Sequence, residues 1–486
     1  MKKFLAILLG IALLAASAYA ASAWYLGKQV ETALANPYKG LDGNPYVKLV
    51  KRDYQRGVFT STESVTIEIL GDIMRATGGS PMLLTAKSLV THGPIGMSQM
   101  AAAVVDTDIY LGGGGLPAKG QPVIKAQTMI SYEGAGEVRG TLQPTTLEFP
   151  DPVAGNLMKL SWTGGEFGMQ FSKDLAEYTT QGTAPKFELG MADGGQVIMS
   201  GIRMSETGKL IFPDEPGLHS GTQKFSIDEM HITVPVSGSK TLVMKKIAYD
   251  TNAPVSGEFL NVTARMQIAD ILVGEQNYGP AHFDMSGKNL HARSLAQLQK
   301  SFAGMQAMGQ PQPGADPMAA LKPLVTAMIG VLKHDPEFSI DRLSFNTPDG
   351  EVLITAKVQV PGVTAQDAEN FMMLMQKISV AADLVVPEAL LMMPFGPAAA
   401  SPEMMSVQLQ ARQQQIASLI EQGYLIREGA LMKSRVQYSA GQVAINGLPF
   451  DPMALQQRPM PAGPALVAQP GRPRTPQNAP LSRPLR

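Results

Sequence analysis

The six histidines are the first residues to test for chemistry, because histidine is both a frequent metal ligand and a general base near neutral pH. They lie at positions 92, 219, 231, 282, 291 and 334, and the closest two, His282 and His291, are nine residues apart. That separation is too long for two ligands on one helical face, and the chain contains no cysteine to complete a thiolate site. We therefore expect no metal ligand among them.

Carboxylates offer two weak candidates. Asp106 and Asp108 precede a glycine run at 112–115, where an oxygen-rich loop could hold a divalent cation, but no glutamate follows at the spacing of a calcium-binding loop. Two pairs of adjacent carboxylates point to opposite faces of their strands or turns, so neither pair forms an acid–base dyad by itself. These pairs are Asp214-Glu215 and Asp228-Glu229. We interpret all of them as polar strand edges and turns.

The motifs of three common enzyme classes are absent: the G-x-S-x-G nucleophile elbow, the G-x-x-x-x-G-K-[ST] phosphate loop and the H-E-x-x-H metal site. The formal net charge of −1 gives no basic field for nucleic acid. The sequence therefore predicts a protein that is not an enzyme, with no catalytic residue, no metal, no cofactor and no nucleic-acid partner.

Methionine is unusually abundant, with 29 residues, and several lie close together in the second half of the chain. Packing in the core is the main interpretation, because the flexible thioether side chain fills irregular gaps. Two alternatives are an adaptable apolar groove and a copper(I) site, and no cysteine or nearby histidine supports the second. The clustered residues are Met372, Met373, Met375, Met392, Met393, Met404 and Met405.

The N-terminal segment is the strongest feature of the sequence. Between Lys3 and Lys28 lie 24 residues without a charge, which span ~36 Å as a helix and exceed the ~30 Å hydrocarbon core of a bilayer. Trp24 and Tyr25 close the segment, as expected at a membrane–water interface. We predict an uncleaved anchor that contacts the bilayer through residues 4–27; a cleaved signal peptide, with small-x-small sites ending at Ala18 or Ala23, is the alternative.

Two lysines in a very short N-terminal end are typical of an export signal. We therefore expect a single pass through the bacterial inner membrane, with the bulk of the chain in the periplasm.

From about residue 43 to 290 the pattern is that of strands and turns. Val65, Ile67 and Ile69 alternate with polar residues, and glycine pairs recur as turn signals, including Gly194-Gly195. The pattern predicts a long antiparallel β-region over these residues.

The second half changes to helices, predicted over 292–309, 317–333 and 402–422. Another is predicted from Thr364, which opens a capping box with Asp367, to about Pro387, because apolar residues recur there every three or four positions. Two strands, 431–438 and 442–447, close the fold. The segment FSIDEMHITVP (225–235) recurs as FSIDRLSFNTP (338–348), which indicates either a repeated unit or chance similarity.

The expected fold class is α+β, with an N-terminal transmembrane helix, a long antiparallel β-meander body and helices inserted in its second half. We divide the chain into the anchor (1–28), a β-rich periplasmic region (29–290), a helix-plus-strand region (291–450) and a tail (451–486). The tail is rich in proline and arginine and cannot bury enough apolar surface to fold, so we expect it to be disordered.

The order of four motifs resembles the YdgA-like family of bacterial envelope proteins, whose function is not established. They are YQRGVFTS (54–61), LSWTGGEF around Trp162, NYGPAHFDMSGKNL (277–290) and the closing QYSAGQVAING. The resemblance runs from residue 1 to about 450 and implies an inner-membrane anchor, a periplasmic body and self-association, but no catalytic residues. The signature residues are Tyr54, Arg56, Gly57, Phe59, Ser61, Trp162, Gly279, Pro280, Asn446 and Gly447.

We interpret the signature as structural, with Arg56-Gly57 bending or turning a strand; a contact between Arg56 and a ligand headgroup is the alternative. The leading hypothesis is a non-enzymatic, membrane-anchored periplasmic protein that binds a partner or itself. The alternative is a binder or carrier of lipid or other apolar ligands, with methionine-rich helices over the sheet forming its pocket.

Overall fold

The computed structural model describes residues 17–32, 34–35, 47–69, 81–96, 99–113, 120–150, 157–191, 193–215, 218–235, 240–307, 317–368, 371–392 and 402–450. Residues 4–16 of the expected anchor and the expected disordered tail at 451–486 lie outside these ranges.

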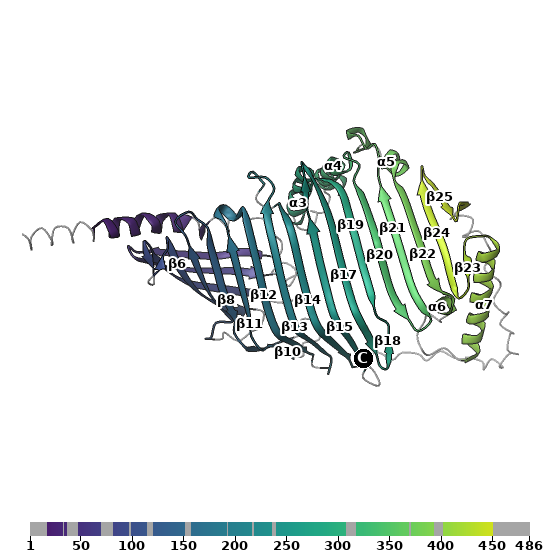
Figure 1. Cartoon of the computed structure of the whole chain (residues 1–486), viewed down its shortest axis with the longest axis horizontal. Helices are drawn as coiled ribbons and strands as arrows, with labels where there is room; N and C mark the ends of the chain where they lie inside the picture. The colour runs from purple at the N-terminus through teal and green to yellow at the C-terminus, as the bar shows by residue number, and fades with distance from the viewer. Residues whose placement is uncertain are drawn as a thin grey trace, which may run out of the picture.

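A single antiparallel sheet of 24 strands dominates the described chain. Its strands lie side by side along the long axis of the molecule, from the N-terminal to the C-terminal end (Figure 1). The first strands are β1 (Val47–Arg56), β2 (Thr60–Ile69), β3 (Met82–His92), β6 (Ala103–Gly113), β7 (Ile124–Ile130), β8 (Gly136–Leu142), β9 (Thr145–Pro150), β10 (Leu157–Trp162) and β11 (Gly165–Phe171). The central strands are β12 (Glu177–Gly190), β13 (Gln196–Leu210), β14 (His219–Val234), β15 (Lys240–Ala253), β16 (Val255–Ser256), β17 (Phe259–Val273), β18 (Gln276–Asn277) and β19 (Ala281–His291). The last are β20 (Glu337–Thr347), β21 (Gly350–Gln359), β22 (Ser379–Pro387), β23 (Ile426–Glu428), β24 (Leu431–Ser439), β25 (Gln442–Ile445) and β26 (Leu448–Phe450).

Most neighbours in the sheet are neighbours in sequence, which makes it a meander. The sheet forks at β12, whose first half pairs with β11 and whose second half pairs with β10. A separate two-stranded ribbon, β4 (Ile95–Gly96) with β5 (Gln99–Met100), follows β3. The sheet continues without a break across residue 290, because β19 pairs with β20.

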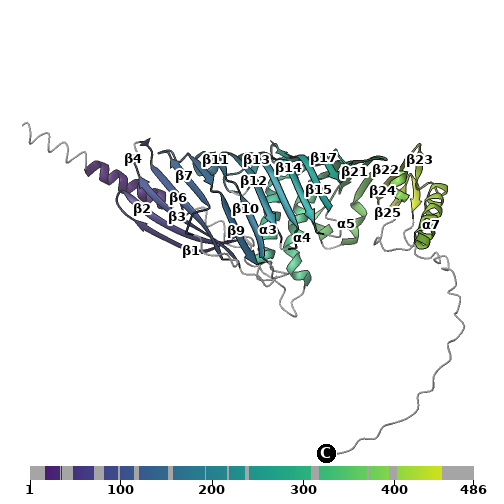
Figure 2. The ribbon, with the colours of Figure 1, turned by 90° about the horizontal axis from the view of Figure 1, so that it is seen from below.

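Helices pack on one side of the sheet and at its C-terminal end (Figure 2). Below the sheet in that view lie α3 (Ala292–Ala307), α4 (Pro317–Leu332) and α5 (Phe371–Lys377), and a core cluster around Leu260, Leu290 and Ala296 joins α3 to β17 and β19. The other helical elements are η1 (Lys173–Leu175), η2 (Ala365–Ala368), α6 (Glu388–Met392) and α7 (Pro402–Glu421). The β-rich α+β class is therefore confirmed.

The predicted helices at 292–309, 317–333 and 402–422 are confirmed as α3, α4 and α7, and the closing strands as β24 and β25. The turn between these strands has positive φ at Ala440 and Gly441, which suits a tight hairpin. Both copies of the FSID segment lie in strands, β14 and β20.

The helix predicted over 364–387 is wrong in its second half. The predicted capping box is present, because the Asp367 carboxylate accepts hydrogen bonds from the Thr364 N–H (2.6 Å) and hydroxyl (2.9 Å). The helical part, however, ends at Lys377. Residues Ser379–Pro387 form β22, which pairs with β21 on one side and β24 on the other. A helix there would leave both neighbours without backbone partners, and this outweighs the helical spacing of the apolar residues.

The expected transmembrane helix is not found among the described residues, where no helix combines the length and the apolar character needed to cross a membrane. What the structure describes of that segment is a helix over residues 17–32, at the β1 end of the sheet (Figure 1). Its Ala23 is 0% exposed, so this face packs against protein.

Asp367 gives a pH-dependent prediction. Its carboxylate also accepts a hydrogen bond from Lys377 Nζ at 2.6 Å, and this contact, with the Thr364 backbone, lowers the pKa of Asp367. A folded-state pKa below the unfolded value stabilises the protein above the unfolded pKa of about 4, and the effect is lost as pH falls through the folded pKa.

We expect Lys377→Met to lower the melting temperature at pH 7, and the gap from the wild type to narrow when melting is followed down to acidic pH. The exposed Lys333→Met serves as control. An equal gap at all pH values would contradict the ion pair.

Candidate functional site

The first five signature residues lie together where β1 turns into β2, and two of them contact the helix of residues 17–32. The Phe59 ring stacks on Tyr19 at 5.8 Å between centroids. The Arg56 guanidinium lies over the Trp24 ring at 5.4 Å and pairs with Glu31 at 3.3 Å. Gly57 lies in the turn, where a Cβ would meet the carbonyl oxygen of Thr60 at 2.3 Å. The signature thus builds a docking surface for the N-terminal helix.

Ser61, the fifth residue, positions a histidine beneath this helix. Its hydroxyl lies 2.9 Å from His92 Nε2, and His92 Nδ1 lies 3.0 Å from the Val58 carbonyl oxygen. Because a carbonyl can only accept, Nδ1 carries the proton and the serine hydroxyl donates to Nε2. The ring is thereby fixed against Gly27 of the helix, where a Cβ would come within 2.4 Å of it.

This serine–histidine pair has the hydrogen bonding of a nucleophile and its base, but not the access. Ser61 is 2% exposed and His92 is 1% exposed. Catalysis needs a substrate within reach of the nucleophile. We therefore assign the pair to helix docking.

Apolar and charged contacts complete the interface. Val30 of the helix packs with Val90, Ala103 and Val105 in one buried cluster. Beside it Arg52 donates to Glu63 at 2.6 Å, and burial raises the pKa of Glu63 while Arg52 opposes the shift. Burial likewise raises the pKa of Tyr54, the first signature residue, which faces Glu63 across the strand pair.

The other five signature residues lie elsewhere and serve the sheet. Trp162 is buried, stacks on Phe187 at 5.7 Å and donates from its indole to the Gln143 carbonyl oxygen at 2.6 Å. Gly279 precedes Pro280 at the start of β19, where a Cβ would meet the Ala269 carbonyl oxygen at 2.4 Å.

Asn446 and Gly447 both have positive φ in the turn from β25 to β26. The Asn446 side chain donates to the Gly423 carbonyl oxygen at 2.8 Å. The structure therefore gathers Tyr54 to Ser61 into one site and leaves the other signature residues as separate structural points.

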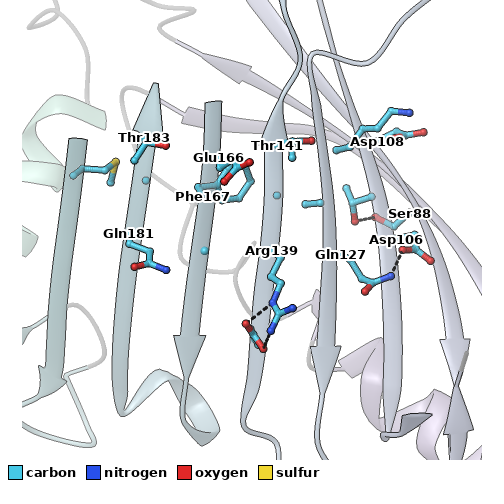
Figure 3. Close-up of a pocket in the computed structure, with 18 of the residues that line it drawn as sticks. Ser88, Asp106, Asp108, Gln127, Arg139, Thr141, Glu166, Phe167, Gln181 and Thr183 are labelled. Carbon is cyan, nitrogen blue, oxygen red and sulfur yellow. Dashed lines mark hydrogen bonds and ion pairs between the residues drawn. The ribbon is translucent and has the colours of Figure 1, made fainter. Parts of the chain in front are cut away.

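A groove of about 1710 Å³ crosses eleven strands, from β1 to β15. In Figure 3, Asp106, Gln127 and Arg139 extend from adjacent strands, and Gln127 donates to Asp106 at 2.9 Å. Seven acidic and five basic residues line the groove, so no single sign of charge dominates. Polar and apolar residues share the groove.

Apolar residues also line this groove, among them Phe167, Met204, Phe225 and Tyr249. Direct cross-strand pairing puts them in one row over ten strands, β11 to β22. We call this the apolar row: Phe167, Gly182, Met204, Phe225, Tyr249, Met266, Phe283, Leu343, Ile354 and Leu384. None of its side chains is fully buried, and Met204 is 46% exposed.

The expected pocket is described only in part, because the side chains of Met393, Met404 and Met405 lie outside the described residues. In α5, Met372 is 69% exposed and Met373 is 48% exposed, while Leu374 packs inward with Val363. Among the described residues no three His, Asp or Glu side chains are grouped as metal ligands. His291 and His334 stack at 4.1 Å, and burial lowers the pKa of His334.

The signature is visible in the sequence, but the residues that contact it are not. His92, Gly27 and Glu31 are distant from it in sequence and have no motif of their own. The one available signal was the position of Gly27 and Val30 on a single helical face.

These features define a β-rich protein built on a long antiparallel sheet. Residues 1–453 match the family model described as "Bacterial protein of unknown function (DUF945)", and the chain belongs to this family. It is also 21% identical over 464 residues to Protein YdgA of Escherichia coli (strain K12), covering 87% of this chain and 90% of that protein. No solved structure matches it. The family match ends where the proline- and arginine-rich tail begins, as expected.

Gly27→Ala tests the docking surface. Because the His92 ring is held by two hydrogen bonds and cannot move away, the added methyl group should lower the free energy of unfolding by about 1–3 kcal/mol. Denaturant unfolding of the full chain measures it, with Lys28→Ala at the neighbouring exposed position as control. Equal stability of both variants would show that the helix is not seated on His92.

Proposed function

We propose that the chain is a non-enzymatic, single-pass protein of the bacterial inner membrane that holds its sheet in the periplasm. The observation that carries the proposal is the docking of residues 17–32 onto the β1–β6 end of the sheet, which joins the uncharged N-terminal segment to the folded body.

The docking narrows the part of the segment available to lipid. Tyr19, Ala23, Gly27 and Val30 contact protein, so we propose that lipid contacts residues 4–18 and the exposed side of the helix that follows. Trp24 and Tyr25, 47% and 58% exposed, then lie where the helix leaves the bilayer, a position that suits amphipathic rings.

The proposal that the protein is not an enzyme is supported by the burial of Ser61 and His92. We propose that the large sheet binds a partner or a second copy of the chain. A second candidate function, binding of lipid or other apolar ligands, is favoured by the apolar row.

Cysteine labelling tests the topology, because the native chain contains no cysteine and gives no background. We expect Glu275→Cys, in an exposed turn, to react with a membrane-impermeant maleimide in intact spheroplasts, and Lys2→Cys to react only after lysis. The protein should also stay with membranes through a carbonate wash. Release by the wash, or labelling of Glu275→Cys only after lysis, would contradict the proposal.

Self-association is the second part of the proposal. We expect the full chain in detergent to elute as a dimer when its mass is measured by light scattering at size exclusion. A strict monomer over a range of protein concentrations would remove this part and leave the topology untouched.

A further inference from the structure

The apolar row is continuous although it includes glycine. Gly182 lies between Phe167 and Met204, and Met204 leans over it, since a Cβ on Gly182 would meet Met204 Cγ at 3.1 Å. In the same way, a Cβ on Gly140 of β8 would lie 2.1 Å from Phe167 Cζ, so the Phe167 ring covers this glycine. Large side chains thus fill the space above small ones, and the row presents an unbroken apolar surface.

The row is long and has defined edges. Nine strand-to-strand steps of about 4.8 Å make it ~43 Å long. On one side it is widened by Ile227, Ile247 and Ile268, which pair directly with one another. On the other side lies Glu206, whose carboxylate accepts a hydrogen bond from the Tyr178 hydroxyl at 2.6 Å.

The row leads away from the end where the N-terminal helix docks. The helix lies at the β1 end of the long axis, and the strands follow one another along that axis to β26 (Figures 1 and 2). Because the row crosses the strands, it runs along the same axis. A sheet held at the bilayer by this helix therefore extends the row outward from the membrane.

We propose that the apolar row binds the acyl chains of membrane phospholipid, and that it guides them along the sheet away from the bilayer. This inference rests on the second candidate function above. Each leaflet of a ~30 Å hydrocarbon core is ~15 Å deep, so the row is longer than two acyl chains laid end to end.

The chemistry of the row favours an acyl chain over a protein partner. Protein interfaces combine apolar contacts with directional hydrogen bonds, about one per 100–200 Å². Along the row the side chains offer such a group only at Tyr249. The three most exposed members, Met204 (46%), Phe225 (37%) and Met266 (37%), are flexible or flat apolar groups that suit a ligand without fixed shape.

Photo-crosslinking in living cells tests the proposal on the full chain. A benzophenone amino acid replaces Phe225 or Met266 on the row, and Lys224 or Gln267 as matched controls. Each control is the sequence neighbour of a row residue and points to the opposite face. After irradiation, the purified protein is analysed by mass spectrometry for adducts with the mass of a phospholipid.

We expect phospholipid adducts at both row positions and at neither control. Adducts to another protein or to a second copy of the chain, equal adducts on both faces, or no adducts would overturn the inference. If the protein still fractionates with membranes, such a failure leaves the proposed anchoring intact, so the two failures are distinguishable.

Continuity is tested by placing a charge in the row. Phe225→Asp should reduce the lipid adduct at position 266 about tenfold, because an apolar contact is lost midway along the path; Lys224→Asp should leave it unchanged. Thermal unfolding checks that the variant folds, and Met204→Asp, at the more exposed position, replaces it if it does not. An undiminished adduct in the folded variant would contradict a continuous path.

Discussion

The helix of residues 17–32 lies so close to the sheet that it requires glycine at position 27. The ring of His92 occupies the space that a side chain at Gly27 would need, and it is held there by Ser61 and the Val58 carbonyl oxygen. Much of the molecule's organisation depends on this contact, because it fixes how the N-terminal segment joins the sheet. A flexible join would leave the direction of the sheet undefined.

The sheet converts local strand pairing into long rows of side chains. Residues paired across neighbouring strands share a face, so one register maintained over many strands aligns their side chains into rows. Five members of the apolar row, from Phe167 on β11 to Tyr249 on β15, line the groove. The surface on which the lipid proposal rests is thus a property of the pairing and is not visible in any single strand.

Elements that are formed by residues close together in the chain could be predicted from the sequence. The capping pair Thr364 and Asp367, the turn at Ala440-Gly441 and the long helices are formed by neighbours in the chain, and each was predicted. The strand Ser379–Pro387 was not, because its identity is decided by β21 and β24, which lie on either side of it. The docking site could not be predicted for a similar reason, since Gly27, Arg56 and His92 come together only in the folded protein.

Hydrogen exchange of residues 17–32 in the membrane-bound protein is the most direct test that this helix and the sheet form one body. If the helix is seated on His92, the backbone amides of its buried turn, from Ala23 to Val30, should exchange as slowly as those of β2 and β3. Amides of this turn that exchange at the rate of an isolated, solvent-exposed helix would contradict the docking, and with it the fixed direction of the sheet.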